Sequence, residues 1–284
     1  MRRVVFLILS VLIIGGVKGQ SFSGTIFTGV SNYQGELQEN PYTFEQSHLA
    51  GGFGLNYEIT EHFIGRANFS FGKVSGDDKT SKKIDRQKRN LNFTSTIIDF
   101  SAGVQYDLFS LYKYLFTPYV YVGVSVYGFN PYTSSPSGPR VYLQPLGTEG
   151  QGVIGGTKKY ELTQLSIPFG GGVKFAVNEN ISIGIEVIMH KLFTDYLDDV
   201  STTYANKADL DYYNGPTAVE YSYRGDELPG AGGTYPSQGD VRGKPSTKDW
   251  FYFTALTASF RLTPSKNHLY DASKYKFDCP SPVN

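Results

Sequence analysis

The chain has 284 residues, and its 26 basic and 26 acidic side chains give a formal net charge of zero. This balance gives no support for nucleic-acid binding, which goes with a strongly basic surface. Aromatic residues make up 15% of the chain, which also contains 32 glycines and 22 tyrosines. No run of about 18 apolar residues follows the amino-terminal segment, so no helical membrane span is expected there. A polar chain rich in aromatic residues and glycine favours a membrane β-barrel, whose strands are apolar on one face.

The amino-terminal residues 1–19 are predicted to be a secretory signal peptide. Arg2 and Arg3 supply the positive end, Val4–Ile14 is the apolar core, and Gly19 is small enough to precede a cleavage site. The apolar core is too short to span a membrane as a helix. No cysteine follows the cleavage site directly, so we expect an exported chain without a lipoprotein anchor.

The clearest structural signal in the mature chain is a long β-hairpin over Leu165–Met189. Large apolar residues occupy every second position in both halves, and the positions between them are small or polar. This period of two predicts two strands joined by the short turn Asn178–Asn180. Each arm has about a dozen residues, which is enough for a tilted strand to cross a bilayer.

The same alternation recurs along the chain and predicts eight strands. One face of each carries mainly apolar residues, and the other carries glycine, serine, asparagine or charge. This pattern is typical of a barrel with an apolar exterior and a polar interior. The predicted strands are Phe22–Ser31, Ser47–Ile59, one that begins at Phe63, Thr94–Leu108, one that includes Val120–Tyr127, the two arms of Leu165–Met189, and Trp250–Leu262.

The connections between the predicted strands alternate between long loops and short turns. The short turns are Thr60–His62, Phe109–Phe116 and Asn178–Asn180. Outer-membrane barrels have short periplasmic turns and long extracellular loops, so both termini are predicted to be periplasmic. Trp250 and Tyr252 are expected in an aromatic girdle at the outer end. The girdle at the periplasmic end is expected to contain Tyr57, Tyr106, Tyr114, Phe116, Phe175 and Phe260.

The predicted fold is an all-β, eight-stranded antiparallel transmembrane barrel in the cell outer membrane, surrounded by outer-membrane lipids. It has long extracellular loops and a short periplasmic carboxy-terminal tail. The predicted divisions are the signal peptide 1–19, the barrel 20–262 and the tail 263–284. A soluble β-sandwich is the competing fold, but it needs neither strands this long nor long loops at one end.

Three charged residues are predicted to point into the lumen near mid-depth: Arg66, Asp99 and Glu186. An eight-stranded barrel has an interior that side chains fill, so a wide pore is not expected. Because an unpaired buried charge is costly, these residues are predicted to pair as a salt-bridge plug. The alternative is a gated channel or a proton path through the same residues.

Catalysis is a further alternative, because small barrels can be lipid-modifying enzymes. Such an enzyme needs an activated nucleophile, usually a serine beside a histidine. Only His48 and His190 are predicted near the outer rim, where Ser47 or Ser75 could approach them. The chain contains no G-x-S-x-G motif. We therefore predict a non-enzymatic protein with no catalytic residue and no cofactor.

Three aspartates, Asp195, Asp198 and Asp199, lie close together in the sequence. Clustered carboxylates can bind Ca²⁺, but this spacing differs from that of an EF-hand loop. We therefore favour a solvated cluster that orders its own loop, and we predict no metal site.

The tail after the last strand is longer than barrel closure requires. Aromatic residues alternate there with lysines, and the single cysteine of the chain lies near the end. We predict that the tail docks onto a periplasmic protein. As the single cysteine of an exported chain, Cys279 is either a free thiol or bonded to a cysteine of that partner. The simpler alternative is a disordered end. The predicted partner-binding residues are Tyr270, Tyr275, Phe277 and Cys279.

Four segments carry a family resemblance: SNYQGEL at Ser31–Leu37, QPLGTEGQG at Gln144–Gly152, IPFGGGVK at Ile167–Lys174 and FTDYLDDVSTTY at Phe193–Tyr204. In these segments the chain resembles the PorG-like outer-membrane barrels associated with the type IX secretion system of Bacteroidetes-type bacteria. The resemblance implies a non-enzymatic role, in which the barrel contacts a periplasmic ring or lipoprotein component of a secretion machine. It also implies that the periplasmic side, including Cys279, meets the partner.

A second function stays open from the sequence alone. The long loops Asn130–Lys158 and Thr194–Lys248 are rich in tyrosine and glycine and could bind a partner at the cell surface. Loop deletions are expected to impair that function, whereas deletion of Thr263–Asn284 is expected to impair a periplasmic one.

Overall fold

The structure is a computed structural model, and it describes residues 21–40, 43–134, 138–153, 157–229, 233–263 and 269–270. The predicted signal peptide lies outside the described residues, as does most of the predicted tail.

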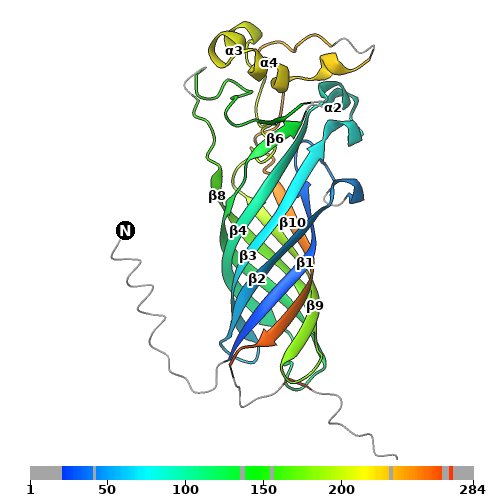
Figure 1. The fold of residues 1–284 in the computed structure, drawn as a ribbon, viewed down its shortest axis with the longest axis vertical. Helices are drawn as coiled ribbons and strands as arrows, with labels where there is room; N and C mark the ends of the chain where they lie inside the picture. The colour runs from blue at the N-terminus through cyan, green and yellow to red at the C-terminus, as the bar shows by residue number, and fades with distance from the viewer. Residues whose placement is uncertain are drawn as a thin grey trace, which may run out of the picture.

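Eight long strands form one closed antiparallel barrel (Figure 1). The first and last strands pair with each other, from Ser23 opposite Arg261 to Gln34 opposite Trp250, so the ring has no open edge. The predicted eight-stranded fold is therefore confirmed. The strands in order around the ring are β1 (Phe22–Gln34), β2 (His48–Glu58), β3 (Phe63–Asp77), β4 (Asn92–Asp107), β5 (Phe116–Gly128), β8 (Thr163–Ala176), β9 (Ile181–Leu192) and β10 (Trp250–Arg261).

The exterior of the barrel is a belt of exposed apolar side chains. Phe100 on β4, Val124 on β5 and Leu256 on β10 are 58%, 67% and 63% exposed. A water-soluble protein rarely exposes so large an apolar surface, whereas a closed barrel leaves no unpaired strand edge and can cross a bilayer. The protein is therefore an outer-membrane β-barrel, as the alternation predicts.

The short turns lie together at one end of the barrel, where β1 begins and β10 ends (Figure 1). Asn178 closes the turn between β8 and β9, because its side-chain oxygen accepts hydrogen bonds from the backbone of Asn180 and Ile181, both at 2.9 Å. Exposed aromatic residues surround this end, and the rings of Phe116 and Phe175 lie 6.0 Å apart. This arrangement agrees with the predicted inner girdle.

Tyr252 does not belong to the outer girdle, so that expectation is wrong. Its residue is only 5% exposed, and its hydroxyl donates a hydrogen bond to the Gln34 side chain. Trp250 packs edge-on against Phe169, with the ring centroids 5.9 Å apart.

The long loops fold into a cap above the barrel, which we define as the described residues of 129–162 and 193–249 (Figure 1). No sequence pattern predicted its elements. Asn206 caps α3 by accepting from two backbone amides, and Gly215, with φ of +89°, ends α3 where α4 begins. The cap contains the hairpin of β6 (Pro131–Ser134) and β7 (Arg140–Tyr142), α3 (Lys207–Asn214), α4 (Pro216–Ser222) and the 3-10 turn η4 (Gly225–Glu227).

Two shorter loops pack beside the cap. The first contains the 3-10 turn η1 (Phe44–Gln46) between β1 and β2, and the second contains η2 (Asp78–Thr80) and α2 (Ile84–Arg89) between β3 and β4.

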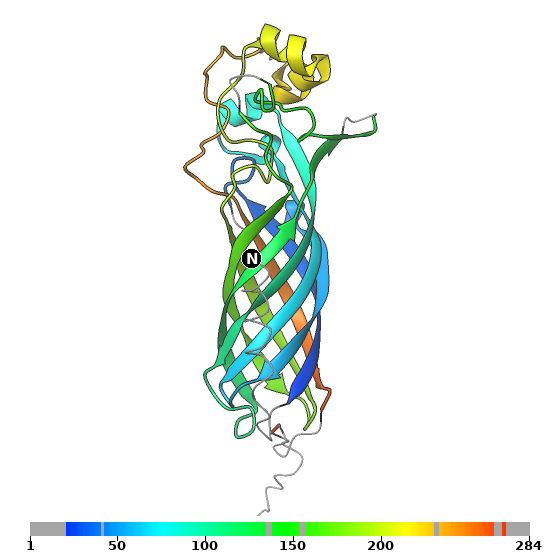
Figure 2. The ribbon, with the colours of Figure 1, turned by 90° about the vertical axis from the view of Figure 1, so that its left-hand side faces the viewer.

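The hairpin of β6 and β7 stands out from the side of the molecule (Figure 2). None of the helices in the described part of the chain is long and apolar enough to span a membrane.

A continuous hydrophobic core fills the barrel at the long-loop end and extends into the cap. We call it the outer core. Its centre is aromatic, because Tyr127 and Phe251 are completely buried and their ring centroids lie 5.3 Å apart. It joins inward-facing residues at the strand ends to residues of the loops: Tyr33, Leu37, Ala50, Val74, Leu91, Phe93, Ile97, Tyr127, Phe129, Leu143, Leu192, Leu197, Val200, Tyr221, Phe251 and Phe253.

Candidate functional site

Below the outer core, the lumen is filled by hydrogen-bonded charged residues, which we call the inner charge network. Arg66 Nη1 donates to Glu186 Oε2 and to Gln105 Oε1, each at 3.0 Å. Tyr119 donates its hydroxyl proton to the same Glu186 oxygen at 2.8 Å. Because Arg66 and Glu186 are 7% and 5% exposed, this pair neutralises both charges away from water.

Asp99 lies apart from that pair, although the sequence analysis grouped it with Arg66 and Glu186. Its Oδ1 is 3.6 Å from Nδ1 of His190, and neither of its carboxylate oxygens has a hydrogen-bond partner among the described residues. His190 contacts Ser166 Oγ at 3.1 Å and stacks on Phe251, with centroids 4.2 Å apart. The structure therefore joins two of the three predicted plug residues and places the third beside a buried histidine.

A second ion pair belongs to the inner charge network. Lys174 Nζ lies 2.8 Å from Asp107 Oδ2, below the Arg66–Glu186 pair and toward the short turns. Between these pairs and the short-turn mouth is a polar cavity of about 60 Å³, large enough for a few water molecules. Glu58, Tyr112 and Leu269 are among its lining residues.

The first part of the predicted tail lies across this mouth. The backbone amide of Tyr270 donates to the carbonyl of Leu111 at 2.7 Å, and that of Leu269 donates to Glu179 at 3.4 Å. Two different short turns therefore hold the chain after β10. The other predicted partner-binding residues, Tyr275, Phe277 and Cys279, lie outside the described residues.

The histidine–serine pairs considered for catalysis are both present as contacts. His48 Nε2 lies 2.7 Å from Ser75 Oγ at the outer rim, and His190 contacts Ser166 within the lumen. No carboxylate of the described residues is hydrogen-bonded to the His48 ring, so a group that would orient it as a base is missing there. His190 and Ser166 are each 2% exposed, so neither side chain is accessible from solvent.

Two of the four segments that carry the family resemblance, Gln144–Gly152 and Phe193–Tyr204, lie in the cap, and a third, Ser31–Leu37, contacts it from the end of β1. Glu149 is central, because its carboxylate accepts hydrogen bonds from the backbone amides of Ser201 and Thr202 and pairs with Arg242 at 2.9 Å. Tyr33 in the first segment donates to Asp198 in the last at 2.5 Å. Sequence reasoning did not assign a role to Glu149 or Arg242. Glu149 lies in the resemblance segment Gln144–Gly152, whereas the only signal for Arg242 was its place in a long polar loop.

The aspartates of the last segment are buried and do not form one cluster. Asp195, Asp198 and Asp199 are 2%, 1% and 0% exposed, so the expectation of a solvated cluster is wrong. Asp199 accepts from Thr148 and Tyr160, at 2.5 and 2.7 Å, while Asp195 accepts from Ser201. The three side chains therefore have different partners, and Asp199 itself has a φ of +67°, in the left-handed region.

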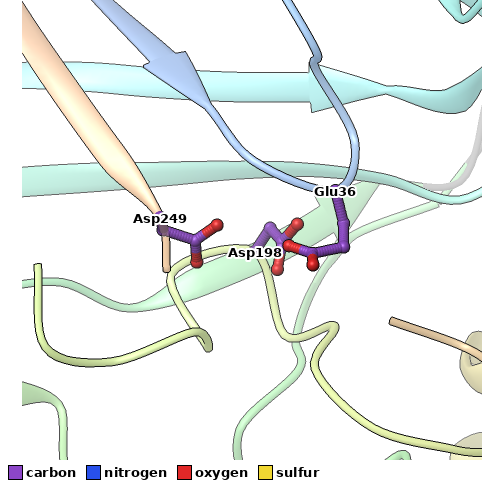
Figure 3. A group of neighbouring side chains, drawn as sticks. All are labelled: Glu36, Asp198 and Asp249. Atoms are coloured by element: carbon purple, nitrogen blue, oxygen red, sulfur yellow. The ribbon is translucent and has the colours of Figure 1, made fainter. Parts of the chain in front are cut away.

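Asp198 instead faces two carboxylates from distant parts of the chain, Glu36 and Asp249 (Figure 3). This is the group in the described residues whose oxygens lie close enough to hold a metal ion. Burial, with Asp195 nearby, raises the pKa of Glu36 to about 7. Burial and the neighbouring carboxylates raise the pKa of Asp198 and of Asp249 well above the usual range.

Several solved structures are similar to the chain. The attachment invasion locus protein Ail of Yersinia pestis, solved with the heparin analogue sucrose octasulfate, is 11% identical with a TM-score of 0.41, covering 87% of this chain and 100% of Ail. Neisserial surface protein A is 11% identical with a TM-score of 0.41, covering 86% and 98%. A major outer membrane protein from Thermus thermophilus is 13% identical with a TM-score of 0.40, covering 85% and 100%.

The search of curated proteins found no match to the sequence. One protein-family model matches residues 2–237, which is most of the chain, and its description is a domain of unknown function, DUF6089. This match includes seven barrel strands, β1 to β5, β8 and β9, and the cap as far as the 3-10 turn η4. The chain therefore belongs to the DUF6089 family.

Proposed function

We propose that the protein is a non-enzymatic outer-membrane scaffold that contacts a periplasmic protein-secretion assembly of the type IX kind through its carboxy-terminal tail. The observation that carries this proposal is the course of the chain after β10. The amides of Leu269 and Tyr270 bond to two short turns, so the tail leaves the barrel against its short-turn face. Short turns face the periplasm in outer-membrane barrels.

The filled lumen also supports a scaffold rather than a channel. The outer core closes the long-loop end with fully buried aromatic rings, and the Arg66–Glu186 pair lies across the lumen below it. An ion would have to displace both to pass. A protein that neither conducts nor offers a substrate-sized cavity in the lumen acts through its surfaces, and the resemblance to PorG-like barrels favours the periplasmic surface.

Deletion of residues 271–284 tests the proposal in living cells. The truncated protein is expected to reach the outer membrane and keep the mobility shift on heating that marks a folded barrel. It is expected to lose cross-links to periplasmic proteins. Cys279→Ser tests the intermolecular disulfide separately, because only a disulfide-linked complex disappears with reductant.

A matched control removes a surface at the other end. Replacement of residues 207–222, which form α3 and α4, by a short glycine–serine linker should leave the periplasmic cross-links unchanged. If the tail deletion keeps all cross-links and secretion while the cap variant loses function, the periplasmic proposal is wrong.

The second candidate function is binding at the cell surface through the cap. It is favoured by the outward aromatic face of α3, where Tyr212 and Tyr213 are 82% and 57% exposed. Exposed tyrosines are common in binding surfaces, because each supplies a large rigid contact area with a polar tip. Substitution of both by serine should abolish cell-surface binding without any change in the short-turn contacts, and unchanged binding would exclude this face.

A further inference from the structure

Three carboxylates from distant segments meet at one buried point at the outer end of the barrel (Figure 3). Glu36 follows β1, Asp198 lies in the loop after β9, and Asp249 directly precedes β10. Each offers an oxygen that lies within 4.8 Å of those of the other two. All three residues are buried, with exposures of 4%, 1% and 0%. The end of β1, the loop after β9 and the start of β10 therefore each place one carboxylate at the same buried point.

A backbone amide donates to one oxygen of each carboxylate. These amides fix the orientation of the three groups and leave each with a second oxygen that no backbone amide holds. The three bonds join Val200 N to Asp198 Oδ1 at 2.9 Å, Leu197 N to Asp249 Oδ2 at 3.0 Å, and Lys244 N to Glu36 Oε1 at 3.2 Å.

The second oxygens have too few donors. The Tyr33 hydroxyl lies 2.5 Å from Asp198 Oδ2 and 3.1 Å from Asp249 Oδ1, but it has one proton to donate. Glu36 Oε2 is buried and has no hydrogen-bond partner among the described residues, although its side chain points toward Asp198 in Figure 3. A buried carboxylate oxygen without a donor is costly, so this atom indicates that a positive group completes the site.

Basic side chains do not supply that positive group. Within the described residues, no lysine or arginine lies within ion-pair distance of Glu36, Asp198 or Asp249. Three arginines of the surrounding loops are paired with other carboxylates: Arg86 with Glu39 at 3.3 Å, Arg89 with Asp78 at 2.7 Å, and Arg242 with Glu149 at 2.9 Å.

We propose that Glu36, Asp198 and Asp249 bind a Ca²⁺ ion. Ca²⁺ takes oxygen ligands at about 2.3–2.6 Å, so oxygens on opposite sides of the ion are about 5 Å apart, which accommodates the spacing here. Mg²⁺ has shorter bonds of about 2.0–2.1 Å and would require the carboxylates to move closer together. Water molecules and backbone carbonyls would complete the coordination. The ion ties the end of β1, the cap and the start of β10 to one another.

Terbium luminescence tests the site in the full-length protein refolded in detergent and freed of metal with EDTA. Tb³⁺ from added TbCl₃ replaces Ca²⁺ in oxygen sites and emits when a nearby tyrosine, here Tyr33, absorbs light. We expect saturable emission that CaCl₂ displaces and that MgCl₂ at the same concentration does not. Dissociation constants of extracellular Ca²⁺ modules are about 0.1–1 mM, so the titration should extend through that range.

Isosteric variants connect this signal to the three residues. Glu36→Gln and Asp198→Asn should each weaken Ca²⁺ binding by at least about tenfold. Asp211→Asn, on the exposed face of α3, is the matched control and should bind as the parent protein does. The heat-dependent gel shift of each variant shows whether the barrel has folded, so loss of binding is separated from misfolding.

Resistance of the cap to trypsin gives a second readout that does not depend on terbium. CaCl₂ should slow cleavage at the cap lysines of the parent protein and have no effect on Glu36→Gln. If the parent protein shows neither saturable emission nor Ca²⁺-dependent protection, or if Glu36→Gln binds as tightly as the parent, the carboxylates share protons instead and the proposal is wrong.

Discussion

The two halves of the lumen are closed by different chemistry. At the long-loop end, the outer core packs aromatic rings such as Tyr127 and Phe251, whose centroids lie 5.3 Å apart. At the short-turn end, the inner charge network uses Arg66–Glu186 and Lys174–Asp107 ion pairs beside a polar cavity. Only the outer half has a folded cap above it. The cap and the outer half of the lumen therefore form one hydrophobic unit.

The two halves should also respond differently to substitution. An apolar core loses stability in proportion to the contacts removed and the cavity left behind. A buried ion pair loses most when one partner is removed and the other remains charged. Phe251→Ala and Arg66→Met test this difference in the lumen, and Thr148→Val and Lys83→Ala extend the comparison to the cap and to an exposed ion pair.

The largest expected effect is that of Phe251→Ala in the outer core. Phe251 is completely buried, and its ring contacts those of Tyr127, His190 and Phe253. Its loss should lower the free energy of unfolding by about 3–5 kcal/mol. Urea unfolding in lipid vesicles measures this, and trypsin should cleave the cap faster. Leu256→Ala on the lipid-facing side is the control, and equal losses for the two variants would contradict a continuous core.

Arg66→Met should cost about 3 kcal/mol, because Glu186 is left as an unpaired buried charge. Water in the adjacent polar cavity solvates the unpaired Glu186 and so limits the loss of stability. The double variant Arg66→Met with Glu186→Met should recover most of it, since both charges are removed together. The same urea titration measures both. If the double variant is as unstable as the sum of the single ones, the two residues are not coupled in the way that their 3.0 Å contact indicates.

Thr148→Val should cost about 1–3 kcal/mol and act on the cap alone. The Thr148 hydroxyl donates to Asp199 at 2.5 Å, and that buried carboxylate would lose one of its donors. Faster trypsin cleavage of the cap with an unchanged heat-dependent gel shift is the expected result. Thr217→Val on the exposed side of α4 is the control and should resemble the parent protein.

The smallest effect is expected for Lys83→Ala. Lys83 pairs with Glu39 at 2.7 Å, but both side chains are substantially exposed, at 63% and 36%. Water and salt screen such a pair, so the loss should stay below about 1 kcal/mol. A urea titration that finds a loss as large as that of Arg66→Met would show that burial does not distinguish the two ion pairs.

The barrel could be predicted from the sequence because each lipid-facing strand repeats a two-residue pattern. The outer core could not be predicted in this way, because the residues that form it interrupt the two-residue pattern. Ile97 and Ile98 are both apolar although they face opposite sides of β4, and Phe251, Tyr252 and Phe253 are consecutive aromatics on β10. Apolar residues on both faces indicate that the interior has become a core. The sequence analysis instead assigned Tyr252 to a girdle.

The carboxylate site was beyond sequence reasoning for a different reason. Glu36, Asp198 and Asp249 belong to three connections that are far apart in the chain, and only the closed ring brings them together. Asp195, Asp198 and Asp199 are neighbours in the sequence, but only Asp198 belongs to the carboxylate site. Its partners there are Glu36 and Asp249. Asp99 was likewise grouped with residues that it does not contact, because its neighbour in the structure is His190 of β9. Local spacing carries no information about contacts that depend on barrel register.

The pairing of β1 with β10 has a consequence for biogenesis. β1 remains an open edge until the last strand arrives, and open edges invite pairing with other chains. Tyr33, near the end of β1, donates to Asp249, which directly precedes β10, at 3.1 Å, so this contact requires both strands to be in place. A chain in which β10 has not yet paired with β1 therefore lacks one of the bonds that hold the outer end of the barrel together.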